Sequence, residues 1–133
     1  MKNDIKVTFP GGKRVDAYYK GFHIETDQPV YQGGEGSAPA PFDLFMASIA
    51  TCAGIYVLSF CQIRNIPTEN LTLTMQSERN PDSKRIEQIS IDIHLPAEFP
   101  EKYTNAVIKS VNGCAVKVHL QNPPVIEVNT NIP

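Results

Sequence analysis

Three cysteines are the side chains of this sequence best suited to covalent chemistry. Cys52 lies among small residues in the middle of a long uncharged segment, which leaves room for a substrate or a second helix to approach. Cys61 follows nine residues later. At about 100° per residue of helix its sulfur points away from that of Cys52, so the two cannot pair within one helix. We expect Cys61 to be an inert packing residue.

The third cysteine, Cys114, follows Asn112 and Gly113 and begins a predicted short helix. A sulfur at the start of a helix lies near free backbone N–H groups and the positive end of the helix dipole, so we expect Cys114 to have a lowered pKa. Cys114 is 62 residues from Cys52 in the sequence. This spacing alone does not establish whether the two thiols are in contact.

The uncharged segment predicts a long helix from Pro41 to Arg64, with no charged residue between Asp43 and Arg64. Pro41 suits the first turn of a helix, and Asp43 and Arg64 suit its two dipole ends. The length is that of a membrane span, but several hydroxyl and amide side chains make the segment only mildly apolar, so we predict a core helix. A helix that is apolar all round must be covered all round. We therefore expect a second copy of the chain to cover it in a homodimer.

Alternating apolar residues predict the strands around this helix. Ile5–Phe9, Arg14–Tyr19 and Phe22–Thr26 are separated by short turns and predict an antiparallel meander. Leu71–Arg79 and Arg85–Leu95 predict a hairpin, and we expect a last strand at Val125–Thr130. Helices are predicted at Glu101–Val111 and Cys114–Leu120. The stretch from Asp27 to Pro41 is rich in glycine and proline, and predicts a long loop that is either functional or a flexible connector.

Length, charge and residue composition limit the classes of protein to which this chain can belong. The 133 residues predict a single domain spanning 1–133, and the net charge of −2 without a basic run argues against a nucleic-acid binder. The N-terminus lacks the apolar region of a signal peptide, so we expect a cytoplasmic protein with reduced thiols. The cysteines have no C-x-x-C spacing and the three histidines are far apart, so we predict neither a metal site nor a cofactor.

The run APAPFDLFMASIATCAG, followed 62 residues later by GCAVKVHL, which begins at Gly113, resembles the OsmC/Ohr family of osmotically induced and organic-hydroperoxide-resistance proteins. The similarity covers nearly the whole chain, including the order of strands, and its flanks look like an uncharacterised subgroup. The resemblance implies an α+β fold in an intertwined homodimer, with antiparallel sheets around central helices that carry the cysteines.

The resemblance also implies a reaction. Active members of the family reduce organic hydroperoxides, so Cys52 would attack the peroxide and become a sulfenic acid. Cys114 would then form a disulfide with it, and an external dithiol such as dihydrolipoamide would restore both thiols. A nearby resolving thiol protects a sulfenic acid from further oxidation. No nucleic acid or membrane takes part in this chemistry.

One position departs from the family pattern. Active peroxidases of the family carry a glutamate ten residues before the attacking cysteine, paired with an arginine that stabilises the thiolate, and this chain has Phe42 there. Asp43 is one residue along and turned by about 100°. Arg14 is the best match to the arginine, but it is equally interpreted as a solvated strand charge. Glu35, in the long loop, is a candidate replacement for the missing glutamate.

Three interpretations therefore stay open. The first is a two-cysteine peroxidase acting on organic or lipid hydroperoxides. The second is a binding or redox-sensing dimer that keeps the fold and holds an apolar ligand, which the phenylalanine at position 42 favours. In the third, all three cysteines are buried structural residues. Replacement of Cys52 by serine separates them, because only the peroxidase would lose turnover.

Overall fold

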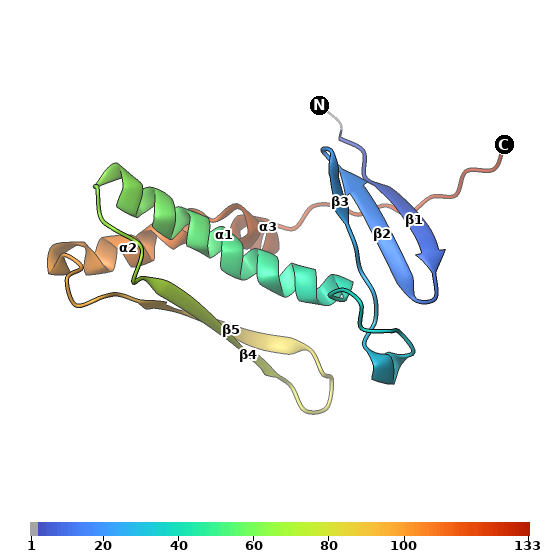
Figure 1. The fold of residues 1–133 in the computed structure, drawn as a ribbon, viewed down its shortest axis with the longest axis horizontal. Helices are drawn as coiled ribbons and strands as arrows, with labels where there is room; N and C mark the ends of the chain where they lie inside the picture. The colour runs from blue at the N-terminus through green and yellow to red at the C-terminus, as the bar shows by residue number, and fades with distance from the viewer. Residues whose placement is uncertain (1–2) are drawn as a thin grey trace. The chain divides into compact units, whose positions relative to one another are not determined.

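The computed structural model describes residues 3–133 and divides into two compact units, each with its own antiparallel sheet (Figure 1). The N-terminal unit ends at Ala47, and the C-terminal unit comprises Ser48–Pro133. The long helix α1, Pro41–Ile63, begins in the first unit and continues into the second. Helices and antiparallel sheets in one chain confirm the predicted α+β class.

The N-terminal unit is the predicted meander. Strands β1 (Lys6–Gly11), β2 (Arg14–Tyr19) and β3 (Phe22–Ile24) pair antiparallel in the order β1-β2-β3. The turn between β2 and β3 has positive φ at both Lys20 and Gly21, 52° and 81°. Positive φ at both central residues is the geometry of the tight hairpin turns that match strand twist. β3 ends two residues earlier than the sequence predicts.

The long loop that follows is organised around one buried carboxylate, Asp27. Its oxygens accept hydrogen bonds from the Gln28 N–H at 2.7 Å, the Ser37 hydroxyl at 2.6 Å, the Ser37 N–H at 3.1 Å and the Glu35 N–H at 3.3 Å. A short 3₁₀ turn, η1 (Val30–Gln32), lies inside the loop. These bonds tie residues ten positions apart to one side chain, so the loop is an ordered element of the N-terminal unit.

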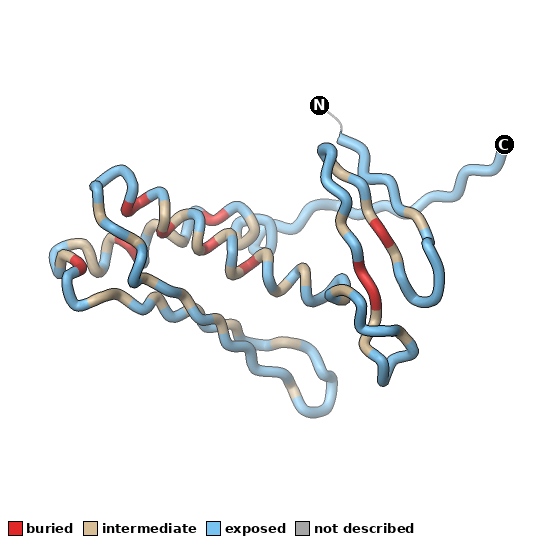
Figure 2. The backbone as a smooth tube through the Cα atoms, in the orientation of Figure 1, coloured by how far each residue is buried: buried red, intermediate tan, exposed pale blue. Residues whose placement is uncertain are grey.

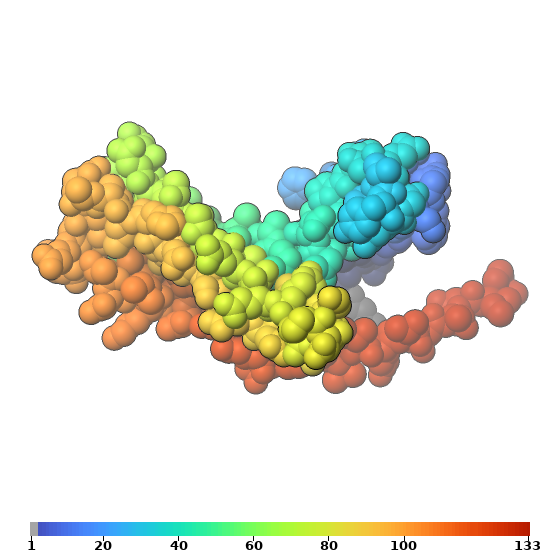
Figure 3. Space-filling view, turned by 90° about the horizontal axis from the view of Figure 1, so that it is seen from below, coloured from blue at the N-terminus to red at the C-terminus, as the bar shows by residue number. Residues whose placement is uncertain are grey.

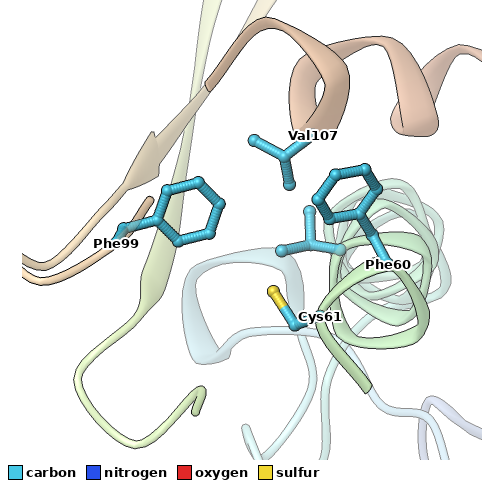
Figure 4. Close-up of a cluster of buried hydrophobic side chains, with 5 residues drawn as sticks. Phe60, Cys61, Phe99 and Val107 are labelled. Carbon is cyan, nitrogen blue, oxygen red and sulfur yellow. The ribbon is translucent and has the colours of Figure 1, made fainter. Parts of the chain in front are cut away.

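The C-terminal unit is built on α1 and the hairpin of β4 (Thr72–Arg79) and β5 (Ile86–His94). Its core joins Val57, Phe60 and Cys61 of α1 to Phe99 and Val107 (Figure 4). The alternation in β5 is confirmed, because Ile89, Ile91 and Ile93 are half-buried while the residues between them are exposed. The apolar faces of the hairpin and helix thus meet as the sequence pattern predicts.

The second predicted helix is divided into η2 (Glu101–Tyr103), α2 (Thr104–Ser110) and η3 (Val111–Gly113), and the third is α3 (Ala115–Gln121). The strand predicted at Val125–Thr130 is wrong. Residues 122–133 form an extended and exposed arm with no helix or strand (Figures 2 and 3). A strand needs a hydrogen-bonded neighbour, and within the described chain this segment has none assigned.

Helix α1 has one charged residue, Asp43, and is otherwise uncharged and mostly apolar. Its mean hydropathy over an 18-residue window is 1.9, so by length and composition alone it is capable of crossing a membrane. Its buried residues nevertheless recur every three to four positions along one side, and they are Ile49, Ala53, Val57, Phe60 and Cys61. That spacing is the core-facing stripe of a packed helix. On the remaining surface of α1, Ile55 and Ile63 are 52% and 77% exposed.

Candidate redox site

The central feature of the C-terminal unit is a contact between two thiols distant in sequence. The sulfurs of Cys52 and Cys114 are joined by a hydrogen bond, and both residues are reduced. Cys52 comes from the middle of α1, and Cys114 is the residue that precedes the first turn of α3. The structure therefore answers the question that spacing left open: the two cysteines are neighbours.

The surroundings of Cys52 favour its thiolate. Burial, the largest single influence, raises the pKa of the Cys52 thiol, but three hydrogen bonds outweigh it and lower the pKa overall. The donors are the Cys114 thiol and the backbone N–H groups of Val116 and Ala115 in the first turn of α3. Hydrogen bonds to the charged form stabilise it. Cys52 is the more acidic and the more accessible sulfur of the pair.

The expected low pKa of Cys114 is wrong. Burial, followed by the hydrogen bond to Cys52, raises the pKa of Cys114, although the N–H groups of Lys117 and Val116 act in the opposite direction. Cys114 is only 2% exposed. The predicted effect of the helix start is real, but it acts mainly on the neighbouring sulfur. The sequence shows which backbone N–H groups are free, while the tertiary fold decides which sulfur receives them.

Cys61 lies outside this pair. It is fully buried in the hydrophobic core that also contains Phe60, Phe99 and Val107 (Figure 4). Burial raises the pKa of its thiol, with a smaller opposing influence from the Arg64 guanidinium. A buried, protonated thiol is a poor nucleophile. These surroundings agree with the expectation that Cys61 is a packing residue.

A cavity of about 740 Å³ opens beside Cys114. The apolar side chains around it come from α1, β5, α2 and α3, and they include Ile49, Ala53, Ile91, Val107, Ile108 and Leu120. Lys117 and Asn112 supply polar atoms, and the Lys117 ammonium donates to the Asn112 amide oxygen at 2.9 Å. The cavity falls within the 300–1,000 Å³ range of small-molecule sites. Sequence patterns did not predict the cavity, because its walls come from elements that are far apart in the chain.

The other predicted site residues lie in the N-terminal unit. Phe42 is 47% exposed, and its ring centroid is 5.3 Å from that of Phe45. Asp43 accepts a hydrogen bond from the Ala40 N–H at 2.9 Å, which caps the start of α1. Arg14 is exposed, and its guanidinium donates to the Gly11 carbonyl at 3.4 Å. Glu35 is exposed on the ordered loop. The roles predicted for Arg14 and Glu35 toward Cys52 stay predictions.

The histidines show no catalytic pairing with a cysteine. His94 is exposed on β5 and shares a 2.8 Å hydrogen bond with the Thr74 hydroxyl. The His119 ring contacts the Ala115 carbonyl at 2.6 Å. His23 lies 2.7 Å from the Asp16 carboxylate. Each ring therefore has its own partner, and in these contacts none of the three histidines is paired with Cys52 or Cys114.

Comparison with known proteins places these features in a family. Residues 34–129 match the OsmC-like protein family. A curated relative, "organic hydroperoxide resistance protein-like 1" of Staphylococcus epidermidis, is 30% identical over 112 residues, which are 77% of this chain and 79% of the relative.

Solved structures show the same fold. A protein from Psychrobacter arcticus, described as a putative osmotic stress induced and detoxification response protein, superimposes with a TM-score of 0.71 at 26% identity, over 86% of this chain and 85% of that one. An OsmC-like protein from Mycoplasma pneumoniae gives a TM-score of 0.70 at 18% identity, over 92% of this chain and 89% of that one. The chain therefore belongs to the OsmC-like protein family.

Proposed function

We propose that this protein is a thiol peroxidase that reduces organic hydroperoxides with Cys52 and Cys114. The observation that carries the proposal is the hydrogen bond between these two sulfurs, with Cys52 the more acidic of the two. A thiolate with a second thiol in contact is the minimum machinery of a two-cysteine peroxidase. Membership of a family with organic-hydroperoxide-resistance relatives supports the same substrate class.

In the first step, the Cys52 thiolate attacks the terminal oxygen of the hydroperoxide and the O–O bond breaks. The oxygen left on the substrate takes a proton and leaves as an alcohol, while Cys52 becomes a sulfenic acid. The N–H groups of Ala115 and Val116 stabilise the thiolate before attack. They supply here, without a carboxylate at position 42, part of the stabilisation that active family members obtain from a glutamate–arginine pair.

In the second step, the Cys114 sulfur attacks the sulfenic sulfur and water leaves. The product is a Cys52–Cys114 disulfide. An external dithiol, of which dihydrolipoamide is our candidate, then reduces the disulfide by thiol–disulfide exchange and is itself oxidised to a cyclic disulfide. We also propose the cytoplasm as the compartment, because reducing conditions there maintain such a dithiol.

The apolar cavity beside Cys114 supports a bulky organic substrate. Its walls are aliphatic side chains from α1, β5 and α2, and burial of a hydrocarbon chain there is favourable at about 25 cal/mol per Å². Hydrogen peroxide gains nothing from such a surface. We therefore expect the catalytic efficiency for an organic hydroperoxide to exceed that for hydrogen peroxide.

We further propose that the active form is a homodimer around α1. Only 28% of the apolar 18-residue window of α1 is buried, and Ile55 and Ile63 remain exposed on the helix in the single chain. A mostly apolar helix with this little of it buried favours a second protein surface as its cover. Sedimentation analysis should give a dimer, and Ile55→Glu should weaken it. A wild-type monomer at micromolar concentration would overturn this part of the proposal.

A binding or redox-sensing dimer is the second candidate, and the cavity is the observation that favours it. A site of about 740 Å³ with mostly aliphatic walls binds an apolar ligand whether or not the thiols react. If the protein is such a binding dimer, Cys52→Ser should leave the ligand affinity unchanged, and the wild-type protein should not turn over peroxide.

One experiment separates the candidates. The fully reduced protein is treated with one equivalent of cumene hydroperoxide, quenched with a thiol alkylator and mapped by mass spectrometry. We expect a Cys52–Cys114 disulfide within seconds, with Cys61 recovered in alkylated form after unfolding. Three alkylated cysteines, at a peroxide concentration that a control peroxidase exhausts, would overturn the peroxidase proposal.

Matched cysteine variants assign the roles. Cys52→Ser should abolish peroxide consumption. Cys114→Ser should consume about one equivalent and accumulate a sulfenic acid that a dimedone-type reagent traps, because its resolving thiol is missing. Cys61→Ala is the control and should behave as wild type. Equal loss in all three variants would point to a folding defect, and circular dichroism of each variant tests for one.

A further inference from the structure

A second group of polar side chains gathers in the N-terminal unit, separate from the sulfur pair. Asp16 of β2, His23 of β3 and Glu25 just beyond β3 each offer one ligand atom, and these atoms all lie within 4.8 Å of one another. Asp16 is buried, while His23 and Glu25 are exposed. An imidazole nitrogen and two carboxylates are common protein ligands of divalent transition metals.

The strand register explains why the three side chains converge. Tyr18 pairs with His23 and Ala17 with Ile24, so the next pair along the ladder is Asp16 with Glu25. The hydrogen bond from the Val15 N–H to the Thr26 carbonyl, 3.1 Å, continues the ladder past that pair. Directly paired residues project to the same face of a sheet, as do residues two apart in a strand. All three ligands therefore stand on one face.

In the described part of the sheet, two carboxylates share this face with one ammonium group, that of Lys6, whose strand partner is Tyr18, so the face favours a further cation. Asp16 and Glu25 are like charges placed directly opposite each other, an arrangement that destabilises a strand pair. The His23 ring, 2.7 Å from the Asp16 carboxylate, offsets at most one of the two charges, and only when protonated. A divalent ion with neutral His23 as a ligand offsets both.

The contacts also hold two of the three ligands, Asp16 and His23, in a suitable geometry. The His23 ring stacks on Tyr18 with centroids 4.5 Å apart and planes 7° from parallel, which fixes the orientation of the imidazole. With metal–ligand bonds of about 2.1 Å, two ligand atoms 2.7 Å apart subtend about 80° at the metal. That angle suits neighbouring positions of an octahedral ion, and the exposed side leaves room for water ligands.

We propose that Asp16, His23 and Glu25 bind one divalent transition-metal ion, with Zn²⁺ as the probe, on this face of the β1–β3 sheet. The site is independent of the proposed peroxidase activity. Its test must exclude the paired thiols of Cys52 and Cys114, which are themselves potential Zn²⁺ ligands, whereas the Cys61 thiol is fully buried. We therefore use the full chain with Cys52→Ser and Cys114→Ser as the background for every variant below.

The test is calorimetric titration with Zn²⁺ at neutral pH, together with the melting temperature with and without Zn²⁺. We expect one ion per chain and a higher melting temperature with the metal, because an ion that binds only the folded state stabilises it. His23→Ala and Glu25→Gln should each weaken Zn²⁺ binding by at least about tenfold and remove the thermal shift. Even substitution of a residue that only hydrogen-bonds to a metal ligand typically weakens metal affinity by about this much. Glu25 is exposed, so its substitution leaves the fold intact.

His94→Ala is the matched control, since His94 is also an exposed strand histidine with a single hydrogen-bonding partner. It should bind Zn²⁺ as the background does. Equal loss in His94→Ala and His23→Ala would show scattered surface binding and would overturn the proposal. Unchanged Zn²⁺ affinity in Glu25→Gln would also overturn the proposal, as would the absence of binding at millimolar Zn²⁺. In either case Asp16 and His23 would form an ion pair and no metal site.

Discussion

The N-terminal and C-terminal units are stabilised by different kinds of interaction. Among residues 3–133, the buried polar residues Asp16, Thr26 and Asp27 all belong to the N-terminal unit. The fully buried apolar side chains and the buried cysteines all belong to the C-terminal unit. The first unit therefore depends on hydrogen bonds with fixed geometry, and the second depends on apolar packing.

This difference between the units affects the pKa values of the cysteines, all of which lie in the apolar unit. A sulfur in the apolar unit is desolvated, which raises its pKa unless hydrogen bonds compensate. Cys52 receives that compensation from Cys114 and α3, whereas Cys61 has no comparable hydrogen bonds and its pKa is raised. Within one apolar unit, three hydrogen-bond donors thus separate a sulfur of lowered pKa from one of raised pKa.

The largest expected effect of a substitution on stability is in the apolar core. Phe60→Ala removes a ring that packs edge-on against Tyr103, with centroids 5.8 Å apart, beneath the Arg64 guanidinium. We expect the free energy of unfolding to fall by about 3–5 kcal/mol, measured by urea denaturation. Tyr31→Ala, an exposed ring of the N-terminal unit, is the control and should change it by less than about 0.5 kcal/mol. Similar losses in both variants would contradict the contrast between the units.

The next effect tests the hydrogen-bonded loop. A Cβ at position 34 would lie 2.0 Å from the Gln28 carbonyl oxygen and 2.8 Å from an Asp27 carboxylate oxygen. Gly34→Ala must therefore displace the backbone, and we expect a loss of about 1–3 kcal/mol. Hydrogen exchange should locate the loss in residues 27–40. Gly21→Asn, where a Cβ meets no atom within 4 Å and asparagine tolerates the positive φ, is the control. Unchanged exchange in Gly34→Ala would contradict the close packing of this loop.

Acid should affect the N-terminal unit through Asp27. Hydrogen bonds, first from the Ser37 hydroxyl and then from the Gln28 and Ser37 N–H groups, lower the pKa of Asp27 from 3.8 to about 2. The unfolded state thus binds the proton more readily than the folded state. Asp27 contributes its full stabilisation above about pH 4, and this is lost as the pH falls toward 2. Asp27→Asn should lower the denaturation midpoint at pH 7 and remove this acid-dependent component. An identical pH profile in both proteins would exclude the role.

Sequence patterns predicted most elements because local periodicity records which face is buried. The uncharged run predicted α1 to within one residue at its C-terminal end, and alternation predicted β2 with its observed bounds. Alternation failed at Val125–Thr130, because periodicity shows that a segment fits a strand but not that a neighbour pairs with it.

The candidate site was predictable only in part for a related reason. The resemblance identified Cys52 and Cys114, but which sulfur receives the N–H groups of α3 depends on tertiary packing, and the prediction for Cys114 was wrong. Asp27 was missed as the centre of its loop, although an aspartate before a glycine-rich loop is a known turn signal. The Asp16–His23–Glu25 group was missed as well, because it becomes visible only when the strand register is known.

The smallest expected effect concerns Cys61, which lies in the same helix as Cys52. Cys61→Ala removes one buried sulfur from the core, and we expect a loss of about 1 kcal/mol, the typical value for a substitution. Peroxide consumption and the Cys52–Cys114 disulfide should be unchanged, since Cys61 receives no stabilising N–H groups. The measurement pairs urea denaturation with peroxide turnover in one preparation. If the folded variant consumed peroxide at a clearly different rate from wild type, Cys61 would influence the redox pair. Packing alone would then not separate the two sulfurs.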